Sequence, residues 1–350
     1  MLLRKAFSAC LVFGVVFAIL HMTLTHAASP SFNLTTSPIP VTLATSPGTT
    51  VTTDLRVKNP TTANEALKVT LYKFDVSPSS EVRILDRASG DSYFDWVNFS
   101  ETKFTVKPNE WKTIKMTIKV PKDAAFGYYY AVGFSRQADP EAAPSAATLT
   151  GQLVTFVLLE AKVPGAKREL KVQSFNANKS TYEFLPSKLT VKVKNTGNIH
   201  VSPKGNIFIY KGSKTVATLD INAGKGNILP NSTRTFTADW SDGFPVYEPN
   251  KDGKKDQKGN LKQSLKWDLS KLTKLRFGKY TAKLVMVYDD GQRDVPIEAT
   301  VSFWVIPWRV ILIAIAIPVL PALLVYVLMK RHYKKKAGIK SWIKYCLTFF

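Results

Sequence analysis

The chain has 350 residues and a formal net charge of +22, yet it contains only two cysteines and four histidines. Both cysteines, Cys10 and Cys346, lie near the ends, and the stretch from 28 to 308 keeps a single histidine, His200. This inventory excludes disulfides, thiol nucleophiles and Cys-ligated zinc from that stretch. Histidine-based catalysis there would depend on one side chain. Because His200 follows a loop-like run, we interpret it as structural or solvent-facing, and we expect no cofactor.

Residues 1–27 have the order of a secretory signal peptide. Arg4 and Lys5 precede an apolar stretch over 6–20, and small residues surround a cleavage point after Ala27. An uncleaved signal anchor is the alternative interpretation. Both interpretations predict that the residues that follow are exported.

Short alternating runs dominate the next 280 or so residues and predict β-strands. In Trp111–Val120 the apolar residues occupy alternate positions, with lysine and threonine between them, and Leu189–Lys194 repeats this pattern. Such alternation is typical of sheets with one face in a core and the other in water. In Tyr128-Tyr129-Tyr130 the alternation places Tyr129 on the face opposite Tyr128 and Tyr130. We expect one face to pack in the core and the other to expose its tyrosine, with an aromatic binding platform as the alternative. Gln137–Thr150, rich in Ala, Pro and Ser, is predicted to be a hairpin tip.

An internal repeat divides this region in two. Three pairs of landmarks recur in order: Val57-Lys58-Asn59 with Val193-Lys194-Asn195, Pro108-Asn109 with Pro230-Asn231, and Phe126-Gly127 with Phe277-Gly278. Repeated strand and turn landmarks predict an all-β fold of two tandem immunoglobulin-like β-sandwich domains, 28–164 and 165–306. The cysteine and core-tryptophan markers of antibody domains are missing. The second copy is longer, by an insert across about 241–270.

Charge is concentrated in the second predicted domain. Residues 166–308 contain 24 Lys and Arg against 13 Asp and Glu, whereas residues 28–165 contain 14 against 13. This excess favours an anionic partner, such as lipid headgroups, a wall polymer or an acidic protein. The predicted export of this region argues against nucleic acid as that partner. A surface that is merely solubilising is the alternative. The possible contacts to an anionic partner are the lysines of the insert: Lys251, Lys254, Lys255, Lys258 and Lys262.

The same insert invites a second interpretation, as a metal site. The run from Glu248 to Gly259 spaces oxygen ligands like the start of a calcium loop. However, Gly259 stands where a bidentate carboxylate is needed, and the lysines would repel a dication. We therefore interpret the insert as a basic hairpin and predict no metal. Asp268–Leu275 is predicted to be at most one short turn, and Asp289-Asp290 to form a turn with Gly291.

Twenty uncharged residues, Val310–Met329, form the longest apolar run of the chain's second half. That length crosses the ~30 Å hydrocarbon layer of a bilayer as a helix, which predicts a transmembrane span over 307–329, kinked by its two prolines. The basic tail 330–350 predicts a plasma-membrane protein with its N-terminal part outside and its tail cytoplasmic, the tail lying along the inner surface. The expected membrane-interface anchors are Trp304, Trp308, Arg309, Lys330, Arg331, Lys334, Lys335 and Lys336.

The whole plan resembles the bacterial cell-surface proteins known as WxL-interacting proteins. Motifs in similar order to that family's peptidoglycan-binding domain cover much of 30–165: Phe94-Asp95-Trp96-Val97, Phe104-Thr105-Val106-Lys107-Pro108, Val120-Pro121 and Phe126-Gly127. The resemblance implies a wall-binding first domain. The second half departs from the family's partner-binding domain, so no functional residue is carried over.

These observations favour a non-catalytic, membrane-anchored surface protein of a bacterium that binds cell-wall polymer or a partner surface protein. A chaperone or assembly factor that binds secreted subunits at a strand edge is the alternative. A wall-acting enzyme or accessory subunit is the third hypothesis. No nucleophile elbow, phosphate loop or zinc helix supports it, and we expect no enzymatic activity.

Overall fold

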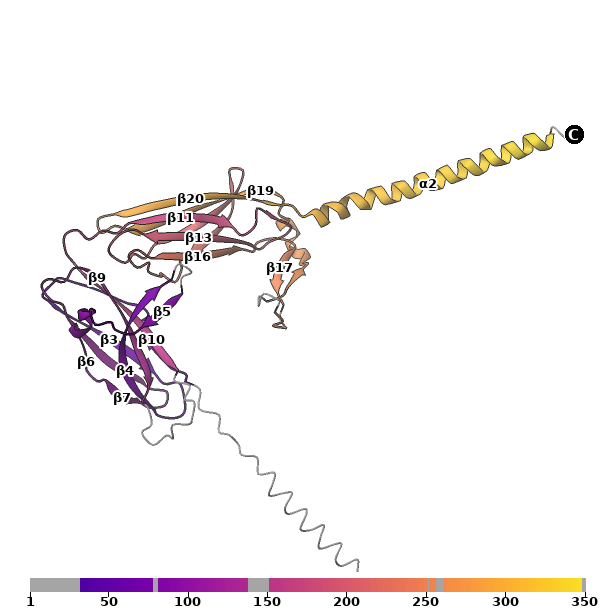
Figure 1. The fold of residues 1–350 in the computed structure, drawn as a ribbon. Coiled ribbons are helices and arrows are strands. Elements are labelled where there is room, and N and C mark those ends of the chain that lie inside the picture. Colours follow the sequence, from indigo (N-terminus) through magenta and orange to yellow (C-terminus); the bar gives the residue numbers. More distant parts are fainter. Residues whose placement is uncertain (1–31, 78–80, 138–150, 251, 256–260, 348–350) are drawn as a thin grey trace, which may run out of the picture.

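The computed structural model describes residues 32–77, 81–137, 151–250, 252–255 and 261–347, with side chains up to Arg331. Two β-sandwiches follow one another along the chain, and one long helix leaves the end of the second (Figure 1). The predicted fold class is therefore confirmed: an all-β chain of two immunoglobulin-like sandwiches with a C-terminal helix long and apolar enough to span a membrane.

The first sandwich consists of two sheets. One has the order β1-β3-β8-β6, and the other has the order β2-β10-β9-β4-β5, with β7 also paired to β4. In chain order the strands are β1 (Thr35–Ser37), β2 (Val41–Thr45), β3 (Thr50–Lys58), β4 (Glu65–Val76), β5 (Val82–Leu85), β6 (Val97–Phe99), β7 (Lys103–Val106), β8 (Trp111–Lys119), β9 (Phe126–Arg136) and β10 (Gln152–Ala161). A 3₁₀ turn, η1 (Ser92–Trp96), precedes β6.

Alternation along β8 places its apolar side chains in the core of the first sandwich, as the sequence predicts. Ile114, Met116 and Ile118 are fully buried there, while the intervening residues are more exposed. The aromatic motifs of this half have the same role. Phe94 is buried, and its ring lies against Tyr93 and Tyr130 at centroid distances of 4.5 and 5.6 Å. These motif residues therefore stabilise the fold.

The second sandwich pairs a sheet of order β11-β13-β16 with a sheet of order β12-β20-β19-β14-β15. Its strands are β11 (Leu170–Ala177), β12 (Thr181–Tyr182), β13 (Ser187–Asn195), β14 (Lys204–Lys211), β15 (Lys214–Ile221), β16 (Thr233–Trp240), β19 (Gly278–Asp289) and β20 (Asp294–Val305). The turn between β19 and β20 is the predicted one: Gly291 has a φ of 101°, and its N–H donates to Asp289 Oδ1.

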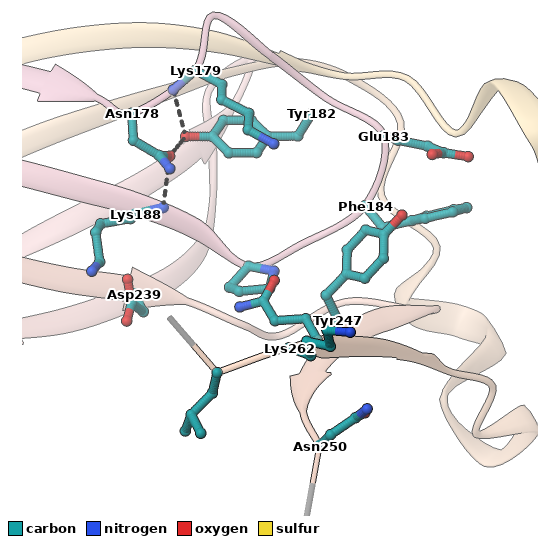
Figure 2. A pocket seen from close by; sticks show the side chains of 13 residues that line it. Asn178, Lys179, Tyr182, Glu183, Phe184, Lys188, Asp239, Tyr247, Asn250 and Lys262 are labelled. Atoms are coloured by element: carbon teal, nitrogen blue, oxygen red, sulfur yellow. Dashed lines mark hydrogen bonds between the residues drawn. The ribbon is translucent and has the colours of Figure 1, made fainter. Parts of the chain in front are cut away.

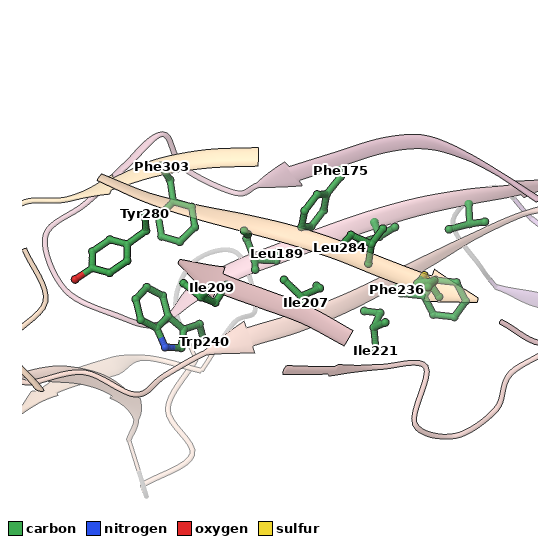
Figure 3. Packing of buried hydrophobic residues seen from close by; sticks show 14 of the residues in the cluster. Phe175, Leu189, Ile207, Ile209, Ile221, Phe236, Trp240, Tyr280, Leu284 and Phe303 are labelled. Atoms are coloured by element: carbon green, nitrogen blue, oxygen red, sulfur yellow. The ribbon is translucent and has the colours of Figure 1, made fainter. Parts of the chain in front are cut away.

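A tryptophan fills the core of the second sandwich (Figure 3). Trp240, at the end of β16, is fully buried and meets Tyr280 at 4.9 Å and Phe303 at 6.1 Å between ring centroids. The sequence analysis expected no antibody-type core tryptophan. A buried tryptophan is nevertheless present, on a strand that ends beside the insert. Leu189 and Ile207 pack from the two facing sheets in the same cluster.

The repeated landmarks adopt the same conformation in both halves. Asn109 and Asn231 both have left-handed backbone angles, with φ of 60° and 59°. Asn59 and Asn195 are both fully buried, and each donates from Nδ2 to the carbonyl four residues ahead and to one distant carbonyl. Each also accepts, through Oδ1, the N–H two residues ahead. The repeat thus marks two equivalent loops.

The insert forms an antiparallel pair, β17 (Val246–Pro249) with β18 (Gln263–Lys266), and this confirms the hairpin interpretation. Residues 251 and 256–260, near its tip, lie outside the described residues. A 3₁₀ turn, η2 (Leu269–Lys274), follows, where one short turn was predicted. Glu248, the first residue of the calcium-like run, pairs with Lys266 at 3.2 Å.

Polar contacts join the two sandwiches. The Tyr129 hydroxyl, on β9, accepts the backbone N–H of His200 at 3.1 Å, and Arg168 forms an ion pair with Glu160. His200 is 6% exposed, which supports its interpretation as a structural residue. Burial is the main reason that its pKa falls to about 4. Of the three tyrosines Tyr130 is fully buried and Tyr128 packs partly against the same core, while Tyr129 lies on the opposite face, as alternation predicts, and contacts His200.

The helix α2 runs from Trp308 to Leu347 and continues through Pro318 and Pro321. Its stretch Trp308–Arg331 is long and apolar enough to cross a membrane. The predicted tail continues the same helix as far as Leu347, and its placement along the inner membrane surface stays a prediction. The predicted hairpin tip at 138–150 and the signal peptide lie outside the described residues.

Candidate functional site

A cleft of about 790 Å³ opens between the second sandwich and the β17–β18 hairpin (Figure 2). Its walls come from the turn between β11 and β12, the start of β13, the end of β16 and both strands of the hairpin. The lining residues are Asn178, Lys179, Tyr182, Glu183, Phe184, Pro186, Lys188, Asp239, Tyr247, Asn250, Leu261, Lys262 and Gln263.

One wall of the cleft is fixed by the phenol of Tyr182. Its hydroxyl donates to Asn178 Oδ1 and accepts the backbone N–H of Lys179 at 3.2 Å. Asn178 Oδ1 also accepts the backbone N–H of Lys188 at 3.3 Å. Burial raises the pKa of Tyr182, so the phenol stays protonated and keeps donating. These bonds hold the turn against β13, and Lys179 and Lys188 lie exposed at its rim.

The residues that line the cleft carry an excess of positive charge. Three lysines line it against two acids, Asp239 and Glu183. Glu183 is already neutralised by Arg309 of α2, whose Nε lies 3.2 Å from Glu183 Oε1. Among the residues that the structure describes, none of the three lysines lies within 4.0 Å of a carboxylate. The three lysine side chains of the cleft are therefore available to bind an anionic ligand.

The floor beneath the hairpin is aromatic. Phe184, 4% exposed, contacts the rings of Tyr247 and Trp267 at centroid distances of 6.1 and 6.3 Å. Trp267 also meets Phe244 edge-on at 5.7 Å. Tyr247 is half-buried and lines the cleft. Amphipathic rings such as those of tyrosine and tryptophan are enriched at protein interfaces, because they add contact area and a hydrogen-bonding tip.

The five predicted lysines of the insert do not converge. Lys262 lines the cleft, whereas Lys254 and Lys255 are exposed, Lys254 lying 3.7 Å from Asp252. Lys251 and Lys258 lie outside the described residues. The sequence analysis missed Lys179 and Lys188, which are far from the insert in sequence. The pairing of β13 with its neighbouring strands brings Lys179 and Lys188 close to the insert.

The predicted membrane-interface anchors lie around the start of α2. Trp304 and Trp308 are about half exposed, at 47% and 49%, and Arg309 forms the ion pair with Glu183. At the other end of the apolar stretch, Lys330 Nζ lies 5.9 Å from the ring of Tyr326, and Arg331 is exposed. The side chains of Lys334, Lys335 and Lys336 lie outside the described part of the chain.

In the described part of the chain, the acidic side chains of the cleft stand without the usual catalytic partners. Within the described residues, no group of three or more His, Cys, Asp or Glu side chains is placed to hold a metal ion. No histidine, serine, threonine or cysteine is among the described lining residues beside Asp239 and Glu183. Cations, a phenol and an aromatic floor suit recognition of an acidic, partly apolar surface.

No family model matches the chain, and no curated protein matches it. Among solved structures, it is similar to the class 5 fimbriae chaperone CfaA at 14% identity, covering 76% of this chain and 98% of that one, with a TM-score of 0.36. The Pseudomonas aeruginosa chaperone CupB2 matches at 11% identity over 77% and 100%, with a TM-score of 0.32. The E. coli chaperone DraB matches at 11% over 77% and 96%, with a TM-score of 0.33. At these scores the function must be argued from this chain's own residues.

Proposed function

We propose that the chain is a non-catalytic, single-pass membrane protein whose exported sandwiches bind a partner surface protein. The cleft beside α2 is the observation that supports this proposal. It combines lysines without acidic partners, an exposed rim and an aromatic floor, and it lies at the end of the sandwich from which the helix leaves.

The partner implied by this cleft is an acidic protein segment with at least one apolar side chain. Lys179, Lys188 and Lys262 would meet its carboxylates, and Tyr247 would cover the apolar group. Charge pairs of this kind set orientation and association rate more than affinity, so the rings would supply much of the binding energy. Membership of the WxL-interacting family, which the motifs of the first half suggest, stays a prediction, as does wall-polymer binding.

Photo-crosslinking in intact source cells tests the proposal. A benzophenone amino acid replaces Lys188 at the rim of the cleft, and in a matched control it replaces Gln292, which is exposed in the β19–β20 turn. We expect a discrete protein adduct from position 188 and none from position 292. Equal yields at both positions would contradict the proposal, and an adduct dissolved by wall-degrading enzyme would favour a wall polymer.

An open strand edge favours one second candidate, an assembly factor for secreted subunits. Within the described residues, β15 pairs with β14 on one side and with no strand on the other. Val216, Ala217 and Leu219 on it are half-buried, so an added strand would find apolar surface as well as backbone partners. A crosslinker at Thr218 that captures unfolded secreted chains would support this function over the first.

A further inference from the structure

Apolar side chains gather on the surface where the insert rejoins the second sandwich. Leu269 and Leu272 in η2 are 73% and 57% exposed, and no residue of η2 is buried. We define the membrane-proximal patch as the exposed apolar residues of this segment and of the start of α2: Trp267, Leu269, Leu272, Leu275, Phe277, Trp304 and Trp308.

The patch is amphipathic, because leucines and lysines are interspersed along one short segment. A 3₁₀ helix has about three residues per turn, so side chains three apart lie on one side. In η2 the turn is interrupted by a kink at Lys271, whose φ is −100°, and Leu275 is extended, so the segment is not one regular helix. Leu269, Leu272 and Leu275 are nevertheless all exposed, and Lys271 and Lys274 alternate with them along the chain. Exposed leucines interspersed with lysines are the pattern of a segment that lies in a membrane interface.

The segment is fastened with its leucines outward. Lys274 and Arg276 both form ion pairs with Asp242, and the Phe244 N–H donates to the Lys274 carbonyl at 3.0 Å. Burial would raise the pKa of Asp242, but its hydrogen bonds and charge interactions with Lys274 and Arg276 outweigh burial and lower that pKa. The leucines therefore cannot turn into the core without breaking these contacts.

The patch and the start of α2 lie at the same end of the sandwich (Figure 1). Phe277 directly precedes Gly278, which pairs with Val305 at the end of β20, and Lys279 pairs with Trp304. Backbone bonds from Trp304 to Ser180 and from Ile306 to Tyr182, both 2.8 Å, hold the chain just before the helix. The patch is thus continuous with the segment that would enter a bilayer.

We propose that the membrane-proximal patch docks on the anionic surface of the bilayer that α2 crosses, so that the second sandwich lies against the membrane. The proposal rests on the anchoring role of α2 in the proposed function. Its tryptophans would sit at headgroup level and its leucines would enter the acyl boundary. Lys271, whose ion pair with Asp268 is long and exposed at 3.7 Å, would meet lipid phosphates, while Lys274 stays paired with Asp242. Such docking would fix the direction in which the cleft faces.

Nitroxide accessibility tests the docking in the full chain. Cys10→Ser and Cys346→Ser remove the native thiols, and single cysteines at Thr273, Gln292 and Leu320 carry the label in three samples. Thr273 adjoins Leu272, Gln292 lies at the far end of the 12-residue strand β19, about 40 Å away, and Leu320 lies within α2. Each is reconstituted in vesicles of phosphatidylglycerol and phosphatidylcholine.

We expect the label at 320 to be reached by oxygen and not by a water-soluble nickel chelate, and the label at 273 to be at least threefold less accessible to the chelate than at 292. Leu269→Ser with Leu272→Ser should return position 273 to the value at 292. Water-like accessibility at 273, with 320 in lipid, would overturn the docking alone. Water-like accessibility at 320 would overturn the anchoring. If the chelate reaches the label at 273 equally little in vesicles of pure phosphatidylcholine, lysine charge does not contribute to the docking.

Discussion

Two buried asparagines, Asn59 and Asn195, organise equivalent loops in the two sandwiches. Each side chain makes at least three hydrogen bonds with backbone groups. Alanine would remove these bonds and leave at least one backbone N–H and one carbonyl without that partner, which costs about 1–3 kcal/mol per site. We expect Asn195→Ala and Asn59→Ala each to lower the free energy of unfolding of their own sandwich by that amount in urea titrations.

The matched control for these variants is Asn206→Ala, because the Asn206 amide donates only to the exposed carboxylate of Asp220. This change should cost less than about 0.5 kcal/mol. If Asn195→Ala costs no more than Asn206→Ala, the loop is not held by its asparagine.

His200 makes the joint between the sandwiches sensitive to acid. Its pKa is lowered from 6.5 to about 4, chiefly by burial, with Glu160 raising it and Arg168 lowering it. Nδ1 has no hydrogen-bond partner within the described structure. The folded state therefore binds fewer protons than the unfolded state between these values, and stability is lost as the pH falls from about 6.5 toward 4.

His200→Gln removes the titrating group, so its melting temperature should change less between pH 7.5 and pH 5 than that of the parent chain. The Tyr129 contact persists in this variant, because it involves the backbone N–H of residue 200. Parallel pH profiles for the parent and the variant would show that His200 does not couple protonation to folding.

The sequence predicted the landmarks at the residue scale but not their contacts. Repetition of Val-Lys-Asn and Pro-Asn identified both loops, because a buried asparagine and a left-handed turn constrain residue type. The contact of Tyr129 with His200 joins residues 71 positions apart in sequence. Neither residue carries a local signal of a partner, so alternation placed Tyr129 on the face opposite Tyr128 and Tyr130 but did not predict its contact with His200.

At the scale of elements, the ion pairs of Asp242 hold η2 against the sandwich. The Asp242 side chain is 39% exposed, so the cost of removing it to overall stability should stay below about 1 kcal/mol. The local effect should be larger, because Lys274 and Arg276 then lose their shared anion. We expect Asp242→Ala to speed amide exchange over 269–277 several-fold while β13 is unaffected.

Asp252→Ala serves as the control, since Asp252 makes only a long, exposed pair with Lys254 at 3.7 Å. Hydrogen exchange followed by mass spectrometry compares the two variants. Unchanged exchange over 269–277 in Asp242→Ala would mean that packing of the neighbouring aromatic residues suffices to hold η2.

Long elements could be predicted from the sequence, whereas short ones and the cleft could not. β8 and β13 show a clear period of two, because each buries one face along nine residues. β12 has two residues and shows no period; its pairing with β20 is set by the chain on either side. The cleft is lined by residues from 178 to 263, and its lysines are brought together by the register of the strands. Strand register cannot be obtained by counting charges along the sequence.

At the scale of the whole molecule, the contacts between the two sandwiches determine how the first sandwich is oriented relative to the second. The linker after Gly165 runs against the loop at 196–198: the Lys167 N–H donates to Asn198 Oδ1 at 2.6 Å, and Asn198 Nδ2 donates to the Gly165 carbonyl at 3.0 Å. Gly197 permits this approach, because a Cβ there would lie 2.1 Å from the Lys167 carbonyl oxygen. A side chain at this position must push the linker away.

Gly197→Ala should therefore alter the geometry between the sandwiches while leaving each core intact. Gly224→Ala is the matched control, because a Cβ there meets nothing within 4 Å. Spin labels at Thr62 and Thr218, both exposed and on different sandwiches, report the distance between them by double electron–electron resonance. We expect a shifted or broadened distribution for Gly197→Ala and the parent distribution for Gly224→Ala. Identical distributions would mean that the contact of Tyr129 with His200 holds the two sandwiches even when the linker is displaced.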